Sequence, residues 1–453
     1  MNNKTIAAIA TPLGEGSIGV IRISGENAFV IADSVFRSFS GKKVADISGY
    51  SALYGEMLCG EEIIDTAVAL KFKAPKSYTG ENVVEISLHG GRYVVKRALR
   101  AVLEAGATAA APGEFTKRAF LNGKLDLVEA EAVMGVISAQ SEAQLRLGMS
   151  ALCGKVSKEI DMIEASLLSV AASVAFFNDN PDEEIPELNT ENFAKNLKGI
   201  SAALLKLITD YDNGHFLREG VETVILGKPN VGKSTLMNLL SRRERSIVTE
   251  IAGTTRDIIE DTVAVGDIIL KISDTAGIHK TDDVVENVGI SRAIKKGEEA
   301  ELILAVFDLS RELDENDLSL IESVRNRNTI IVLNKSDIAV NIDEKVFCGF
   351  EKVYISAKSG EGTEELSAKI AEVTVGKALS ADTAVLGSER QRDLAEKAKR
   401  AVDEALDALL EGLTVDAVGV LIDDALSHLY SLTGKRVTNA VADEVFEKFC
   451  VGK

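Results

Sequence analysis

The octapeptide Gly227-Lys228-Pro229-Asn230-Val231-Gly232-Lys233-Ser234 decides the fold of this chain. It matches the pattern Gly-x-x-x-x-Gly-Lys-Ser/Thr, follows the apolar run 221–226 and precedes a helical pattern. Glycines let backbone N–H groups close around phosphates, and the start of a helix adds the positive end of its dipole. The sequence therefore predicts a phosphate-binding loop, in which Lys233 reaches the β- and γ-phosphates and Ser234 holds Mg²⁺.

The section around this loop, residues 219–376, alternates β-rich runs with helical ones. This alternation predicts a doubly wound sheet of mixed but mainly parallel strands. The runs expected to form strands are 221–226, 262–265, 268–272, 302–307, 329–333 and 353–355.

Two further motifs follow predicted strands of this sheet. Asp274-Thr275-Ala276-Gly277 comes after run 268–272, where Asp274 can reach Mg²⁺ through water and Gly277 can offer its N–H to the γ-phosphate. Asn334-Lys335-Ser336-Asp337 comes after run 329–333. Asp337 can accept two hydrogen bonds from guanine N1–H and the 2-amino group, a donor pair that adenine lacks. We therefore expect GTP, with Ser356-Ala357-Lys358 backing the base.

The first switch loop is expected at Thr249-Glu250-Ile251-Ala252-Gly253-Thr254-Thr255-Arg256-Asp257, with Thr255 as the Mg²⁺ ligand. Ile278 follows Gly277, where Ras-like proteins carry a water-orienting Gln, and an isoleucine cannot orient water. Asp282, Asp283 and Glu286 are nearby acids, and spacing alone does not choose among them. The full set of expected nucleotide contacts is Asn230, Val231, Gly232, Lys233, Ser234, Thr235, Thr249, Glu250, Ile251, Ala252, Gly253, Thr254, Thr255, Asp274, Thr275, Ala276, Gly277, Asn334, Lys335, Asp337, Ser356, Ala357 and Lys358.

The sections that flank the nucleotide-binding part differ from it in texture. Residues 1–120 mix short β-like runs with a helical run and predict an α+β domain. Residues 126–217 have helical periodicity, for which we expect two or three long amphipathic helices, and the same texture returns at 388–453. A helical domain split by an insertion is the simplest explanation. The predicted divisions are 1–120, 121–217, 218–378 and 379–453.

Composition excludes several classes of protein. Four widely scattered cysteines, with no Cys-x-x-Cys pair, disfavour a disulfide framework or a structural zinc site and favour a cytosolic location. No apolar run reaches about 18 residues, so no membrane association is expected. The formal net charge of −19 argues against a mostly electrostatic nucleic-acid binder, although a local basic patch stays possible.

Several motifs carry a resemblance to a known family. Gly227 to Ser234 together with Ile251 to Asp257 resembles the TrmE-Era-Septin branch of GTPases. The rest of the chain is similar to the MnmE (TrmE) family of tRNA-modification GTPases. The motifs that carry this similarity are Ile9-Ala10-Thr11-Pro12, Arg22-Ile23-Ser24-Gly25, Tyr78-Thr79-Gly80-Glu81, His89-Gly90-Gly91, Pro112-Gly113-Glu114-Phe115, Arg118 to Asp126, and the tail Cys450-Val451-Gly452-Lys453.

The resemblance implies an N-terminal domain that dimerises and binds folate, a discontinuous helical domain and an inserted Ras-like G domain. Family members hydrolyse GTP when their G domains pair in a K⁺-dependent way. With the FAD protein MnmG, in a heterotetramer or larger assembly, they modify C5 of the wobble uridine of certain tRNAs. The added group is aminomethyl or carboxymethylaminomethyl, and its one-carbon unit comes from a folate such as 5-formyltetrahydrofolate or 5,10-methylenetetrahydrofolate.

The resemblance also implies roles for individual residues. Glu286 matches the catalytic Glu that orients water, and Cys450 matches the tail cysteine. The residues that match the K⁺ contacts are Asn230, Thr249, Ile251 and Thr254. The residues that match the folate contacts are Arg22, Glu85, Lys124 and Lys453.

Two other classes of function stay open from the sequence. A ribosome-assembly GTPase of the Era or Der type would need an RNA-binding module, and no KH-type loop in a basic context is visible. A septin-like regulatory switch need not carry the folate-type N-terminal domain or the Cys-x-Gly-Lys tail. The chain departs from the MnmE pattern at Val451, at His279 and in the acidic segment 178–186.

Overall fold

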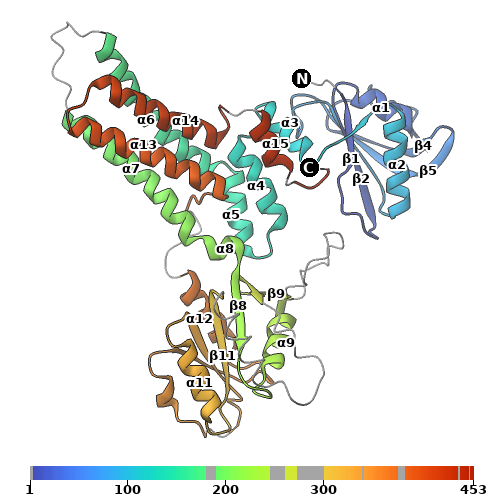
Figure 1. Cartoon of the computed structure of the whole chain (residues 1–453). Helices are drawn as coiled ribbons and strands as arrows, with labels where there is room; N and C mark the ends of the chain where they lie inside the picture. Colours follow the sequence, from blue (N-terminus) through green and yellow to red (C-terminus); the bar gives the residue numbers. More distant parts are fainter. Residues whose placement is uncertain are drawn as a thin grey trace.

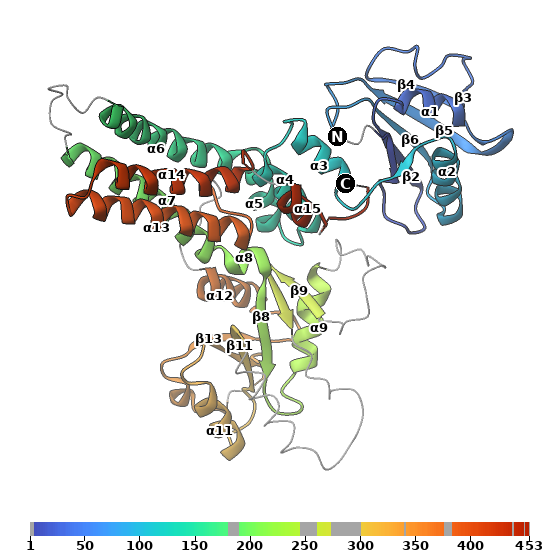
Figure 2. The same ribbon diagram turned by 45° about the horizontal axis from the view of Figure 1, so that its top comes forward.

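The computed structural model describes residues 4–179, 190–244, 261–272, 300–338, 341–375, 383–436, 439–447 and 449–452. The described chain forms an N-terminal α+β domain, a helical domain and a G domain (Figure 1). In Figures 1 and 2 the N-terminal domain and the G domain both adjoin the end of the helical domain that carries α4 and α5.

The N-terminal domain is built on a seven-stranded sheet of order β3-β4-β5-β6-β2-β1-β7. Its strands are β1 (Ile6–Ile9), β2 (Ile18–Ser24), β3 (Phe36–Ser38), β4 (Ser51–Cys59), β5 (Glu62–Phe72), β6 (Val83–His89) and β7 (Thr108–Ala109). Helices α1 (Ala28–Val35) and α2 (Arg92–Glu104) share a core with Ile21 and Ile86. Because strand side chains alternate between faces, Arg22 and Glu85 point to the face opposite these two helices.

The helical domain combines two distant parts of the chain, as predicted. Helices α4 (Leu127–Ser138), α5 (Glu142–Leu152), α6 (Lys155–Asp179) and α7 (Thr190–Asn213) pack with α13 (Glu389–Leu410) and α14 (Val415–Thr433). One hydrophobic core joins residues such as Leu167 and Leu204 to Val402 and Leu429.

Between residues 126 and 214 the described chain forms four helices: α6 and α7 are the long helices that were expected, and α4 and α5 are two shorter ones that were not predicted as separate helices. The Ser141 side chain caps the N-terminus of α5 by accepting from the N–H of Gln144. Gly154 then ends this stretch with a left-handed φ of 75°. Both breaks fall inside a run whose apolar periodicity continues, so periodicity alone did not reveal them.

The G domain has a six-stranded sheet of order β13-β12-β11-β8-β10-β9. Its strands are β8 (Val221–Leu226), β9 (Asp261–Val265), β10 (Ile268–Ile272), β11 (Leu302–Asp308), β12 (Thr329–Asn334) and β13 (Glu351–Ile355). All neighbours are parallel except β9 and β10, which confirms the predicted mainly parallel sheet. Among the described residues of this domain, the helical elements are α9 (Lys233–Glu244), α11 (Glu315–Val324), η1 (Glu344–Phe347) and α12 (Thr363–Val375).

Short elements connect the three domains. Helix α8 (His215–Glu219) leads from α7 into β8, and the Gln144 side chain of α5 donates to the carbonyl oxygen of Arg218 at 3.1 Å. Helix α15 (Asn439–Glu447) packs against α3 (Glu114–Leu121) through Phe446 and Phe120. Among the described residues, no helix is both long enough and apolar enough to cross a membrane.

Candidate functional site

The phosphate-binding loop lies between β8 and α9, as the sequence predicts. Asn230 and Gly232 both have left-handed backbones, with φ of 64° and 100°. A Cβ at Gly232 would lie 2.1 Å from Nδ2 of Asn334, so only glycine fits there. The side chains of Ser234 and Thr235 are exposed at the start of α9, where a ligand can reach them.

Lys233 turns back into the loop that precedes it. Its Nζ donates to the carbonyl oxygens of Gly227 at 2.7 Å and Lys228 at 2.6 Å. Burial lowers the pKa of Lys233, because a desolvated ammonium is disfavoured. An anion in the loop would relieve this cost, which is the electrostatic property that a phosphate site needs.

Asn334 ties the phosphate-binding loop to the loop expected behind the base. Its Nδ2 donates to the carbonyl oxygen of Val231 at 2.7 Å, and its Oδ1 accepts from the N–H of Ala357 at 2.9 Å. The side chain is buried, so both hydrogen bonds are protected from water. Strands β8, β12 and β13 are parallel within the sheet, so their carboxyl ends meet at one edge. Three of the motifs found in the sequence are thereby brought together.

Lys335 is held by an acid that sequence reasoning did not single out. Its Nζ lies 2.5 Å from Oδ2 of Asp308, the last residue of β11. Burial by itself raises the pKa of Asp308, but hydrogen bonds from Lys335 and Ser310 outweigh it and hold this pKa below its usual value. Asp308 could have been found from the sequence, because it is an acid at the carboxyl end of a predicted parallel strand, and that strand lies next to the one that carries Asn334.

The remaining described residues of the nucleotide motifs lie at the same edge. Ser356 and Ala357 are buried, whereas Asp337 and Lys358 are exposed and free to contact a ligand. The predictions for residues 249–255, 274–277, 278, 286 and 453 lie outside the described residues.

A second cluster forms on the N-terminal domain around Arg22. Its Nε lies 2.8 Å from Oε1 of Glu85, and its guanidinium lies 5.4 Å from the ring centroid of Tyr78 and 5.6 Å from that of Phe115. Burial raises the pKa of Tyr78, whose hydroxyl hydrogen-bonds with the Thr116 hydroxyl at 2.8 Å. Two of the four predicted folate contacts are thus an ion pair framed by aromatic rings.

The C-terminal tail returns to this cluster. Arg22 donates through Nη1 to the carbonyl oxygen of Gly452 at 3.3 Å, across 430 positions of the chain. A Cβ at Gly452 would lie 2.2 Å from the carbonyl oxygen of Ile9, so the tail passes β1 where only glycine fits. Cys450 accepts through its carbonyl oxygen from the N–H of Gly113 at 3.4 Å, and its side chain is exposed.

Lys124 lies near the Arg22 cluster, beside the turn that follows Tyr78. Its Nζ donates to the carbonyl oxygen of Pro75 at 3.4 Å, and its Cγ lies 3.4 Å from the position of a Cβ on Gly80.

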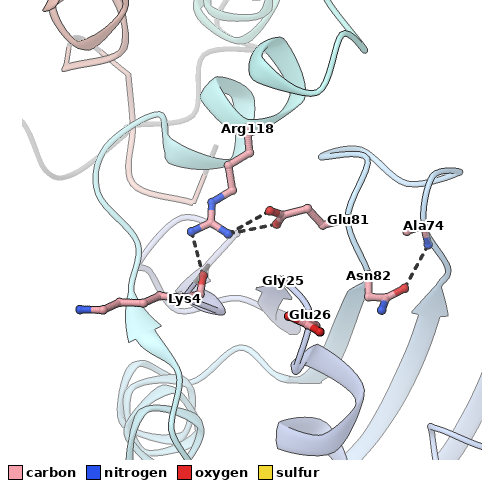
Figure 3. A pocket seen from close by; sticks show the side chains of 7 residues that line it. All are labelled: Lys4, Gly25, Glu26, Ala74, Glu81, Asn82 and Arg118. Carbon is pink, nitrogen blue, oxygen red and sulfur yellow. Dashed lines mark hydrogen bonds and ion pairs between the residues drawn. The ribbon is translucent and has the colours of Figure 1, made fainter. Parts of the chain in front are cut away.

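A hollow of about 220 Å³ lies beside the turn that contains Ala74 and Pro75 (Figure 3). Its lining residues are Lys4, Gly25, Glu26, Ala74, Glu81, Asn82 and Arg118. Arg118 turns to Glu81 at 3.0 Å, so its charge is already compensated.

Family models match most of the chain. Residues 5–124 match the model of the GTP-binding protein TrmE N-terminus, and residues 127–450 match that of the MnmE helical domain. A tRNA modification GTPase MnmE from Clostridioides difficile is 39% identical over 99% of each chain. Its counterpart from Caldicellulosiruptor saccharolyticus is 38% identical over 100% of each chain.

Among solved structures, the FeoB G-domain from Methanococcus jannaschii is 26% identical and covers 34% of this chain and 97% of its own, with a TM-score of 0.25. Era from Aquifex aeolicus, bound to GDP and AlF4⁻, is 26% identical over 40% of this chain and 66% of its own, with a TM-score of 0.26. These low TM-scores add no weight to the assignment. The full-length identity and the two family models suffice: this chain belongs to the MnmE (TrmE) family.

Proposed function

We propose that this chain is a GTP hydrolase that acts in tRNA modification. The observation that carries the proposal is the linkage through Asn334, which joins the phosphate-binding loop to the two loops expected around a guanine base. Full-length similarity to proteins named tRNA modification GTPase MnmE supports the same activity. The Era-like and septin-like alternatives gain no comparable support over the N-terminal domain and the tail.

The roles of individual G-domain residues are part of the proposal. Lys233 holds the β- and γ-phosphates, Ser234 and Thr255 supply oxygens to Mg²⁺, and Asp337 selects guanine. The oxygen donors and the exposed position of Ser234 fit Mg²⁺, which is usually bound by few protein oxygens together with phosphates. The bound Mg²⁺ would neutralise charge on the phosphates, while Glu286 orients the attacking water. Glu286→Ala should then abolish hydrolysis and spare GTP binding, and a loss of GTP affinity would contradict this role.

The finer proposal concerns K⁺ and dimerisation of the G domains. Asn230, Thr249, Ile251 and Thr254 are proposed to contact K⁺, which can neutralise developing charge where other GTPases insert an arginine. The side-chain oxygen of Asn230 fits this role, because oxygen ligands suit hard cations and the left-handed φ of 64° sets this residue at the turn of the loop.

The folate proposal rests on the cluster around Arg22. A folate offers carboxylates and a pterin with donor and acceptor edges, and Arg22, Glu85 and Lys124 present complementary groups beside the rings of Tyr78 and Phe115. Lys453 and Cys450 would join them from the tail, which Arg22 already contacts at Gly452. The folate would supply a one-carbon unit, and these residues would bind and orient it.

The proposed partners are a second copy of this chain through the N-terminal domain, MnmG and tRNA. The proposed product carries an aminomethyl or carboxymethylaminomethyl group at C5 of the wobble uridine.

Nucleotide selectivity tests the GTPase proposal directly. The purified chain should hydrolyse GTP and not ATP, and Asp337→Asn should shift preference toward xanthosine triphosphate, whose 2-oxo group needs a donor. Equal hydrolysis of ATP and GTP by the unmodified chain, or an unchanged GTP preference in the variant, would refute the assignment.

A further inference from the structure

We propose that four lysines and one tyrosine on the N-terminal domain contact a single-stranded loop of RNA, through its phosphates and one stacked base. This basic rim consists of Lys4, Lys73, Lys76, Lys124 and Tyr50. The inference rests on the proposed function in tRNA modification and names the surface on which that RNA is held.

The four lysines surround one turn between β5 and β6. The N–H of Lys76 donates to the carbonyl oxygen of Lys73 at 3.0 Å, so both lysines belong to the same turn. Lys124 reaches that turn through its hydrogen bond to Pro75. Lys4 and Ala74 line the same hollow, and the Lys4 side chain points away from the hollow (Figure 3).

The lysine charges of the basic rim are not compensated by the described acids. All four side chains are exposed, and none forms an ion pair with an acid among the described residues. Arg118 differs, because it pairs with Glu81 and Glu114. Glu26 is the one acid in the nearby hollow other than Glu81. In a chain whose formal net charge is −19, such a group of free cations is a local reversal of charge that suits a polyanion.

Tyr50 places an aromatic ring among these lysines. Its hydroxyl donates to the carbonyl oxygen of Lys76, and the residue is 58% exposed. The backbone has a left-handed φ of 61°, which is unfavourable for a bulky side chain by roughly 1 kcal/mol or more. The N–H of Tyr50 donates to the carbonyl oxygen of Lys71 at 2.8 Å. The exposed ring is therefore fixed in place at a conformational cost.

The buried side chain of Lys71 holds the segment that leads to Tyr50. Lys71 Nζ donates to the carbonyl oxygens of Ala45 at 2.7 Å and Ile47 at 2.8 Å, and it lies 4.3 Å from the ring centroid of Phe29. Burial lowers the pKa of Lys71. The ring of Tyr50 also meets Phe72 edge-on, with 5.9 Å between centroids. The aromatic surface of the basic rim is thus pre-organised, which lowers the entropy lost on binding.

The combination of cations and one exposed ring favours single-stranded RNA as the ligand. Cations along a surface track phosphates, and aromatic side chains stack with unpaired bases. An oligoglutamate tail of a folate would match the lysines, but it has no ring to stack on Tyr50. Lys124 belongs to the basic rim and lies beside Gly80, two residues after Tyr78 of the Arg22 cluster, so RNA on the rim would bring an unpaired base near the proposed folate site.

Binding of an unmodified anticodon stem-loop RNA, with uridine at the wobble position, tests the basic rim. The full-length chain is compared with Lys73→Glu/Lys76→Glu and with the control Lys195→Glu/Lys198→Glu, whose exposed lysines lie on α7 of the helical domain. The first variant should bind about tenfold more weakly at low salt, with a salt-dependence slope shallower by about 1.5. The control should bind like the unmodified chain. GTP hydrolysis, carried out in the G domain, should be unchanged in both, and an unchanged thermal unfolding curve confirms that the substituted N-terminal domain is folded.

Tyr50 is tested separately from the lysines. Tyr50→Ala should weaken binding by about tenfold without changing the salt slope, and Tyr50→Phe should retain the affinity. Equal RNA binding by the unmodified chain and by both the Lys73/Lys76 and Tyr50→Ala variants would overturn the proposal. The proposal would also be overturned if the Lys73→Glu/Lys76→Glu variant bound RNA like the unmodified chain but bound a folate polyglutamate more weakly. If instead the unmodified chain fails both to bind RNA and to modify tRNA, the proposed function itself fails.

Discussion

The side-chain amide of Asn334 donates a hydrogen bond of 2.7 Å to the carbonyl oxygen of Val231, in the middle of the phosphate-binding loop. The same amide accepts from Ala357. One side chain thus links the loop for the phosphates to the loop for the base.

Asn334→Ala should therefore weaken GTP binding by about tenfold or more. The substitution leaves the N–H of Ala357 and the carbonyl oxygen of Val231 buried without partners, at roughly 1–3 kcal/mol each. Nucleotide titration with a fluorescent GTP analogue measures the effect. Asn341→Ala, which changes an exposed asparagine of the same domain, is the matched control and should bind GTP normally. Equal affinities for the two variants would contradict the bridging role.

Asp308→Asn should reduce thermal stability at neutral pH and lower GTP affinity, because Lys335 loses its charged partner. The folded-state pKa of Asp308 is lowered from its ordinary value of 3.8. The ionised carboxylate therefore adds to the free energy of unfolding above pH 3.8, and this contribution is lost as the pH falls through the folded-state pKa. The difference in melting temperature between the unmodified chain and the variant should hold from about pH 8 to 5 and shrink below about pH 4. A melting-temperature difference that widens toward low pH would contradict a stabilising role for the ionised Asp308.

Potassium should stimulate GTP hydrolysis by about tenfold or more over sodium at equal ionic strength. Asn230→Gly keeps the left-handed backbone available and removes only the side-chain oxygen. This variant should bind GTP normally and hydrolyse it equally slowly in both salts. Steady-state rates in KCl and NaCl decide the matter, and equal rates for the unmodified chain would rule out the K⁺ proposal.

Arg22→Ala and Glu85→Gln should each weaken binding of 5-formyltetrahydrofolate by about tenfold. Each substitution removes the charge-assisted hydrogen bond that the residue is proposed to make with folate, and each breaks the ion pair between Arg22 and Glu85. Isothermal titration of the full-length chain gives the affinities. Arg37→Ala breaks an exposed ion pair with Glu56 on the same sheet and should bind folate like the unmodified chain. GTP hydrolysis in the absence of folate should be unaffected in all three. Folate affinity that is equal in Arg22→Ala and Arg37→Ala would remove Arg22 from the site.

Much of the G domain could be predicted from local signals. The phosphate-binding loop needs its glycines and flanking apolar runs, and the strands of a parallel sheet are near-continuous apolar segments, so β8, β11 and β12 are evident in the sequence. Helix ends were harder: the N-cap at Ser141 and the left-handed Gly154 interrupt a periodicity that otherwise continues.

Contacts between distant segments could not be predicted from local patterns. The pair Asp308–Lys335 depends on β11 lying next to β12, and the contact of Arg22 with Gly452 depends on how the tail folds back. Family resemblance placed Arg22 and Lys453 in one site, but no periodicity or spacing did. The left-handed backbone of Tyr50 likewise leaves no signal in the sequence.

The most direct test of the central claim is analysis of wobble nucleosides by mass spectrometry, in a bacterial strain that lacks its own MnmE-family gene. Expression of this chain should restore the aminomethyl or carboxymethylaminomethyl group at C5 of the wobble uridine, and Lys233→Ala should not. Wobble uridines that stay unmodified, while the chain is expressed and hydrolyses GTP, would contradict the account.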